Sequence, residues 1–133
     1  MLRRRFLTAA FSIATAAMIA GAASAGEIRP FDQETFEIAQ RDAEPILIEI
    51  SAPWCPVCRA QKPIIQALAE NPSYEGMIVL EVDFDRQKDV VRAFGARSQS
   101  TLIMFRGAEE TGRSVGDTDP ERIEALVAGA FGS

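Results

Sequence analysis

Three short apolar runs, separated by segments with helical spacing, constrain the fold of this chain most. They span residues 46–50, 77–82 and 101–105. Apolar runs of about four to eight residues bounded by turn signals are typical of buried strands. Because parallel strands are joined by long crossovers, usually through a helix, this alternation predicts an α/β domain.

Helix signals lie before, between and after these runs. Asp32, Asp85 and Asp119 are suitable N-cap residues. Pro120 fits the first helical position of the last helix, and Gly95 fits the end of the short helix that begins near Asp85.

The longest expected helix begins at Cys55 and continues to about Glu70, where Asn71-Pro72 stops it. Pro63 lies inside this helix and predicts a kink. Apolar residues at helical spacing indicate the face that packs on the sheet: Val57, Ala60, Ile64 and Leu68.

A hairpin is expected after the third apolar run. Gly107 lies in a short loop before a weaker strand that reaches Val115. The hairpin adds an antiparallel edge to strands otherwise joined by right-handed parallel crossovers. The expected fold is therefore a mixed central sheet with helices on both faces.

The first 25 residues have the pattern of a signal peptide. Arg3 to Arg5 precede an alanine-rich apolar stretch, and Ala23-Ser24-Ala25 fits a signal peptidase site, which leaves a domain of residues 26–133. We therefore expect export to the periplasm. The arginine run also resembles a twin-arginine signal, although Leu2 stands where Ser or Thr is usual, so the Sec and twin-arginine routes both stay open. A retained membrane anchor is the alternative to cleavage, and it is disfavoured because the apolar stretch is short.

The charge of the expected mature domain limits its partners. Without the three arginines of the signal, eleven basic and nineteen acidic residues leave a net charge of −8. An acidic domain is a poor partner for nucleic acid or anionic lipid, which attract basic surfaces. Contact with a membrane is expected only through an uncleaved signal segment.

Cys55 and Cys58 are the only cysteines, and the chain has no histidine. The lack of histidine excludes Ser-His-Asp and Cys-His catalysis and any histidine-ligated metal. A disulfide between Cys55 and Cys58 closes a very small loop and stabilises a fold little, so the pair suits reversible exchange better than crosslinking. Zinc binding is the alternative, but two thiolates supply only half of a tetrahedral zinc site.

The position of the pair assigns a different chemistry to each cysteine. Cys55 lies at the start of the expected helix, where free backbone N–H groups and the helix dipole stabilise a thiolate. Cys58 lies on the first turn, close enough to attack a mixed disulfide at Cys55. Exchange through these two sulfurs needs no bound cofactor and no metal.

The segment Trp54-Cys55-Pro56-Val57-Cys58 resembles the Trp-Cys-x-x-Cys active site of the thioredoxin family. Further matches are Pro63, at the family's helix-kinking proline, and Val115-Gly116, at its late glycine. The resemblance covers residues 26–133 and implies a thioredoxin-like fold and thiol-disulfide oxidoreductase activity. It also implies that Cys55 is the nucleophile and Cys58 the resolving thiol, and that Trp54 and Pro56 flank the substrate. For Trp54, core packing is the alternative.

Glu49 lies within the apolar run at 46–50. A carboxylate in such a buried run must be paired with a cation, be protonated or have a functional role. By the resemblance it is the buried acid that takes the proton of Cys58. Burial should raise the pKa of Glu49 toward the range in which it can accept that proton. Glu81 stands where the family often has a lysine, and a second carboxylate would raise the pKa of Glu49 further. An edge-facing or water-bridged glutamate is the alternative.

Ser100 is the clearest departure from the family. The family has a cis-proline immediately before the threonine that Thr101 matches, and this chain has Ser100 in its place. Gln99 would still offer backbone groups to an extended substrate, so Gln99, Ser100 and Thr101 are assigned to substrate binding. A cis bond before a non-proline residue costs about 3–4 kcal/mol, and we therefore expect the Gln99–Ser100 bond to be trans.

The sequence thus predicts an exported thiol-disulfide oxidoreductase that acts on cysteines of other proteins and is recycled by a separate redox partner. Reductase, oxidase and isomerase directions stay open, because Pro56-Val57 between the cysteines does not define a reduction potential. The alternative is a non-catalytic binding module that holds a client protein or a metal, for which Ser100 is the best support.

Overall fold

The structure is a computed structural model and describes residues 26–132. The predicted signal peptide, residues 1–25, lies outside the described residues. The strands are β1 (Glu27–Pro30), β2 (Pro45–Ser51), β3 (Ile78–Asp83), β4 (Thr101–Arg106) and β5 (Glu109–Val115). The helices are α1 (Gln33–Arg41), α2 (Pro56–Glu70), α3 (Lys88–Ala93) and α4 (Pro120–Ala128), with a 3-10 turn, η1 (Pro72–Tyr74), after α2.

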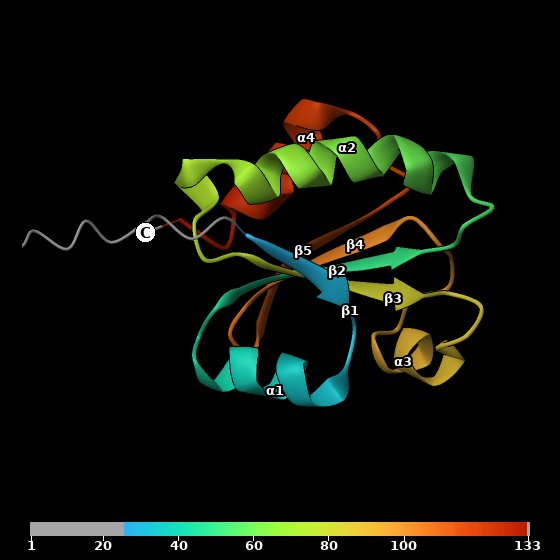
Figure 1. The fold of residues 1–133 in the computed structure, drawn as a ribbon, viewed down its shortest axis with the longest axis horizontal. Helices are drawn as coiled ribbons and strands as arrows, with labels where there is room; N and C mark the ends of the chain where they lie inside the picture. Colours follow the sequence, from blue (N-terminus) through green and yellow to red (C-terminus); the bar gives the residue numbers. More distant parts are fainter. Residues whose placement is uncertain (1–25, 133) are drawn as a thin grey trace, which may run out of the picture.

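The five strands form one mixed sheet in the order β1-β3-β2-β4-β5 (Figure 1). β3 is parallel to β1 and β2, whereas β4 is antiparallel to β2 and β5. The predicted mixed sheet with a terminal antiparallel hairpin is confirmed. β1 was not expected, because its four residues are all exposed and show no apolar pattern.

Helices cover both faces of the sheet, as predicted: α1 and α3 lie on one face, and α2 and α4 on the other (Figure 1). Side chains of β2 alternate between the two faces. Ile46, Ile48 and Ile50 belong to the apolar cluster under α1 and α3, and Leu47 belongs to the cluster under α2 and α4. Glu49, two residues after Leu47, therefore faces α2.

Two of the three predicted helix caps are confirmed. The side chain of Asp32 accepts a hydrogen bond from the Thr35 backbone N–H at 2.8 Å, and Asp119 caps α4, which begins at Pro120 as expected. The prediction for Asp85 was wrong. α3 begins at Lys88 without a side-chain cap, because Asp83 first folds the chain into a turn by accepting from the N–H groups of residues 85 and 86.

The buried face of α2 also differs from the predicted one. Leu68 is buried as predicted, but Ala60 is exposed, and Val57 and Ile64 are only half-buried. The helix instead packs on the sheet through a face about one residue further along the chain. Its buried residues are Cys58, Gln61, Ile65, Leu68 and Ala69. Polar Gln61 is thereby turned into the interior.

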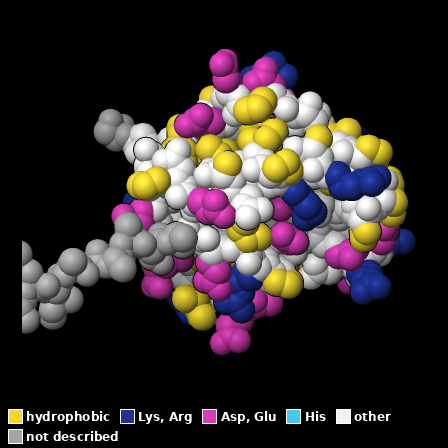
Figure 2. Space-filling model, turned by 45° about the horizontal axis from the view of Figure 1, so that its top comes forward, with side chains coloured by type: hydrophobic (Ala, Val, Ile, Leu, Met, Phe, Trp, Pro, Cys, Tyr) yellow, Lys and Arg dark blue, Asp and Glu magenta, His cyan; other side chains and the backbone are white. Residues whose placement is uncertain are grey.

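A groove lies between α2 and α4 on the outer surface of that face. Its volume is about 410 Å³, and Figure 2 shows hydrophobic side chains gathered on this face with acidic side chains around them. None of the predicted site residues lines this groove. Within residues 26–132, no helix combines the length and the apolar character needed to cross a bilayer.

Candidate active site

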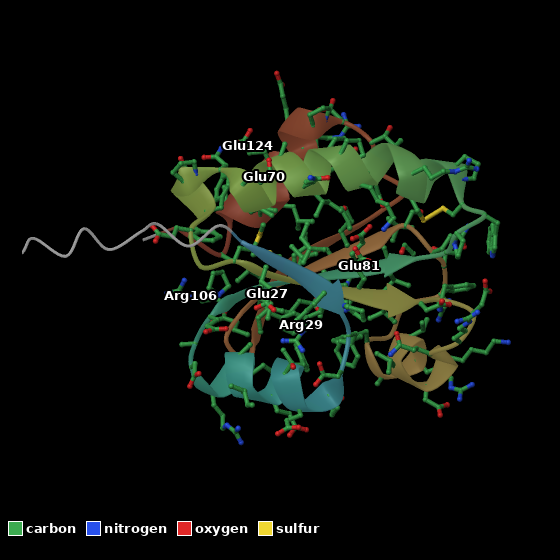
Figure 3. All side chains as sticks on the ribbon, in the orientation of Figure 1. Glu27, Arg29, Glu70, Glu81, Arg106 and Glu124 are labelled. Carbon is green, nitrogen blue, oxygen red and sulfur yellow. A yellow bond between two sulfur atoms is a disulfide. The ribbon has the colours of Figure 1, made fainter. Side chains whose placement is uncertain are left out.

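Cys55 and Cys58 form a disulfide where α2 begins, at the end of the loop that follows β2 (Figure 3). Their Cα atoms are 5.3 Å apart. The backbone N–H of Cys55 donates to the carbonyl of Ala52 at 3.1 Å and folds the loop back. Pro56 then fits the first helical position, because it has no N–H to leave unpaired and a suitable φ.

The backbone at the start of α2 is directed at the sulfur of Cys55. Cys55 is the N-cap residue, and its Sγ accepts a hydrogen bond from the N–H of Cys58 at 3.1 Å. In the dithiol state this N–H and the positive end of the helix dipole favour a thiolate at Cys55. Both cysteine residues are buried in the disulfide state, with exposed fractions of 1% for Cys55 and 0% for Cys58.

Trp54 lies on the surface beside the buried disulfide. Its side chain is 55% exposed, so core packing, the alternative for this residue, is wrong. The indole Nε1–H donates to Asp85 Oδ2 at 2.7 Å, which fixes the ring. Asp85 therefore orients Trp54 instead of capping α3. With Pro56, which is also exposed, Trp54 forms an apolar rim next to the sulfurs.

Glu49 is buried in the sheet, with 1% of its surface exposed. It lies opposite Glu81 in the β2–β3 pair, and Lys62 of α2 bridges the two carboxylates. Lys62 Nζ is 3.5 Å from Glu49 Oε1 and 3.7 Å from Glu81 Oε2. Figure 3 shows Glu81 on the sheet beneath α2. The alternative of an edge-facing glutamate is wrong, because β2 is flanked by β3 and β4.

The pKa of Glu49 is raised above its ordinary value. Burial is the main cause, the positive charge of Lys62 opposes it, and the negative charge of Glu81 adds to it. Lys62 was not predicted as a site residue. It follows Cys58 by four residues, which places the two on the same side of α2, and this spacing was the signal that could have found it. Glu49 thus faces the side of the helix that carries Cys58.

The loop before β4 has the predicted trans peptide bond at Gln99–Ser100, since residues 26–132 contain no cis bond. Ser100 has a φ of 58°, in the left-handed region, which costs a non-glycine residue about 1–2 kcal/mol. Its hydroxyl donates to the carbonyl of Gln99 at 2.6 Å. The hydroxyl of Thr101 donates to the carbonyl of Ser98 at 2.7 Å, so both side chains serve the shape of this loop.

Sheet pairing brings this loop to the cysteine pair. Thr101 is the first residue of β4 and pairs with Ile50, near the end of β2. The loop that carries Cys55 leaves β2 at the same end of the sheet. The predicted substrate-binding residues therefore gather there, from two segments far apart in the sequence.

Comparison with known proteins assigns the family. The thioredoxin family model matches residues 27–129. The chain belongs to the thioredoxin family. Its sequence is 36% identical over 84 residues to Thioredoxin 1 of Nostoc sp. (strain PCC 7120), covering 62% of this chain and 77% of that protein. It is 28% identical over 115 residues to the protein disulfide-isomerase of Aspergillus niger, of which it covers 22%.

Solved thioredoxin structures have the same fold. The structure of Trxlp from Edwardsiella tarda EIB202 matches with a TM-score of 0.74 and 34% identity, over 76% of this chain and 98% of that one. A mutant thioredoxin from Halobacterium salinarum NRC-1 matches with a TM-score of 0.71, over 85% of this chain and 98% of that one. At 24% identity, the second likeness shows the fold alone.

As a thioredoxin-family protein with its Cys-x-x-Cys pair intact, the chain is a thiol-disulfide oxidoreductase. Such exchange proceeds between sulfur atoms of protein thiols and disulfides. Within residues 26–132, no three side chains of the types His, Cys, Asp and Glu are grouped so that they could hold a metal ion.

Proposed function

We propose that this protein is an exported thiol-disulfide oxidoreductase that exchanges disulfides with cysteines of other proteins through Cys55 and Cys58. The observation that carries the proposal is the hydrogen bond from the Cys58 N–H to the Cys55 sulfur at the N-terminus of α2. It favours a stabilised thiolate beside the exposed ring of Trp54.

In the reducing direction, the Cys55 thiolate attacks one sulfur of a substrate disulfide. The substrate S–S bond breaks, one substrate thiolate leaves, and a mixed disulfide forms at Cys55. Cys58 then loses its proton and attacks the Cys55 sulfur, which releases the second substrate thiolate. Two electrons pass to the substrate, and the protein is left with the Cys55–Cys58 disulfide. The oxidising direction is the reverse of these steps.

Glu49 is proposed to accept the proton that Cys58 releases. Its raised pKa makes it a better proton acceptor than an ordinary surface carboxylate, and it faces the side of α2 on which Cys58 lies. Lys62 keeps it from being protonated permanently, because its ammonium stabilises the ionised form.

The substrate is proposed to lie between the apolar rim of Trp54 and Pro56 and the loop at Gln99, Ser100 and Thr101. The backbone groups of Gln99 would pair with an extended segment of the substrate, as a strand pairs with a sheet edge. Ser100 and Thr101 contribute through the loop shape that their hydroxyls hold.

Export to the periplasm is proposed from the first 25 residues. Their arginines, apolar stretch and Ala23-Ser24-Ala25 sequence support cleavage before Gly26. A separate redox partner must return the cysteine pair to its starting state, because each turnover changes the pair by two electrons.

The test is a trapping experiment on the mature domain, residues 26–133. Cys58→Ser removes the resolving thiol, so a mixed disulfide between Cys55 and a disulfide-bonded substrate protein should accumulate and should disappear on adding dithiothreitol. Cys55→Ser is the matched control and should form no such adduct. If Cys58→Ser never forms a covalent complex, the residue roles proposed here are wrong, and the binding-module alternative would explain the protein better.

A further inference from the structure

Gln61 is a buried amide that links α2 to the loop at Ser100. It follows Cys58 by three residues on the buried face of the helix and is 0% exposed. Its Nε2 donates to the carbonyl of Asp117 at 2.8 Å and to the carbonyl of Ser100 at 3.3 Å. The same carbonyl of Ser100 also accepts from the N–H of Gly116 at 3.0 Å.

The orientation of this amide follows from its partners. Both are carbonyl oxygens, which only accept hydrogen bonds, so Gln61 must direct its NH2 group at them. Its Oε1 is then buried and has no donor among residues 26–132. A methionine or leucine would fill this space without burying an unpaired oxygen. The two donated hydrogen bonds are therefore what a glutamine specifically provides here.

The first of the two carbonyls belongs to Asp117, whose side chain is held by several hydrogen bonds. The carboxylate of Asp117 accepts two hydrogen bonds from Arg122, at 2.9 and 3.0 Å, and one from the N–H of Asp119, the cap of α4. Gln61 thus ties the Ser100 loop to the start of α4 as well as to α2.

The second carbonyl belongs to Ser100, the residue of the loop whose backbone is strained. Ser100 is in the left-handed region, which residues other than glycine adopt only where the surroundings hold them. The bond from its own hydroxyl to Gln99 is local and moves with the loop. The bonds from Gln61 and Gly116 come from outside the loop and hold its position relative to the cysteine pair.

We propose that Gln61 is a positioning residue that holds the Ser98–Thr101 loop for an extended polypeptide substrate. The inference rests on the proposed function, in which the backbone of Gln99 pairs with that substrate. If Gln61 is lost, Ser100 can relax toward negative φ and turn the Gln99 peptide away. A disulfide reagent without a polypeptide does not use this pairing and should be unaffected.

The experiment compares two disulfide substrates from which the reduced protein releases the same chromophore, 5-thio-2-nitrobenzoate. One is a cysteine peptide in mixed disulfide with 5-thio-2-nitrobenzoate, and the other is 5,5′-dithiobis(2-nitrobenzoate), which carries no peptide. Gln61→Met should raise the KM for the peptide roughly five- to tenfold, the scale of one lost hydrogen bond, with the rate for the peptide-free reagent within about twofold of the parent. Gln66→Met is the matched control, since Gln66 is exposed on the same helix, and should change neither.

Two further variants test whether the position of the Ser98–Thr101 loop controls the KM for the peptide. Adding Ser100→Gly to Gln61→Met should recover part of the peptide KM, because glycine adopts positive φ without strain. Arg122→Met removes the two hydrogen bonds that the Asp117 carboxylate accepts from a side chain that is 68% exposed, and should change the peptide KM in the same direction. Equal effects on both substrates, or no effect of Gln61→Met and Arg122→Met on either, would overturn the proposal. A parent protein that reacts with neither substrate would overturn the proposed function instead.

Discussion

Removing the positive charge of Lys62 should lower the stability of the folded protein in a pH-dependent way. Lys62 is the cation that bridges Glu49 and Glu81. In Lys62→Met the side chain keeps a similar length and helix propensity but loses its charge. Two facing carboxylates, one of them buried, then remain without the cation, so the folded state should lose stability wherever Glu49 is ionised.

The size of the loss follows from the distance and the exposure of the pair. Two unit charges about 3.5 Å apart attract by about 1 kcal/mol in water and by about 5 kcal/mol at an effective dielectric constant of about 20. The Lys62 side chain is 46% exposed, whereas that of Glu49 is 2% exposed. Solvent therefore screens one partner only, and we expect a loss of about 1–2 kcal/mol at neutral pH.

The pH dependence of this loss has a defined sign. The pKa of Glu49 in the folded protein is raised above its ordinary value of 4.5, so ionising Glu49 costs stability as the pH rises from about 4.5 through that higher pKa. Removing the Lys62 charge raises the pKa further and increases this cost. The difference between Lys62→Met and the parent should therefore be smallest at acid pH, where Glu49 is protonated, and should grow as the pH rises above about 4.5 and Glu49 ionises.

Urea unfolding of both proteins over this pH range measures the difference directly. Arg59→Met is the matched control, because Arg59 is exposed on the same helix and has no ion pair among residues 26–132; its effect should be small at every pH. The reasoning is refuted if Lys62→Met has the stability of the parent at neutral pH, or if its loss is the same at about pH 4 as at neutral pH.

Three further predictions concern the residues around the disulfide. In Cys58→Ser, the remaining Cys55 thiolate should form well below the ordinary pKa of about 8.5, as ultraviolet absorbance against pH would measure; titration near that value would contradict activation by the helix terminus. Ser100→Gly should keep the free energy of unfolding within about 1 kcal/mol of the parent, whereas Ser100→Pro should lose more than that, because proline cannot adopt the observed φ of 58°. Asp85→Ala should change the fluorescence of Trp54, the single tryptophan, but lower stability by less than about 0.5 kcal/mol in urea unfolding. A loss of about 1 kcal/mol or more would instead point to a helix cap at Asp85.

Local patterns of apolar residues predicted most of the fold. The β2 and β4 strands are mostly apolar, with Glu49 as the charged exception in β2, because they are buried on both faces, and this is the pattern that a sequence shows most clearly. β1 could not be found in this way, because it is a short edge strand with exposed side chains. Its strand conformation comes from pairing with β3, a contact between distant parts of the chain.

The side-chain partners of the site were harder to predict than its cysteines. A Cys-x-x-Cys pair is visible in the sequence itself, whereas the importance of Lys62 and Gln61 depends on how far α2 is rotated about its axis. The apolar residues of α2 predicted a face about one residue away from the observed one. A shift of one residue is a rotation of about 100° about the helix axis. This rotation turns Gln61 inward and brings Lys62 over Glu49, and packing against the sheet decides it.

The disulfide is attached to β2, the strand at the middle of the sheet. The backbone of β2 is paired on both sides, and the side chains of five of its residues are fully buried or nearly so. Central, buried strands of this kind have opening free energies that approach that of global unfolding. The cysteines therefore lie just beyond the end of a strand that is paired on both sides and buried, so the segment that leads to them should open only rarely.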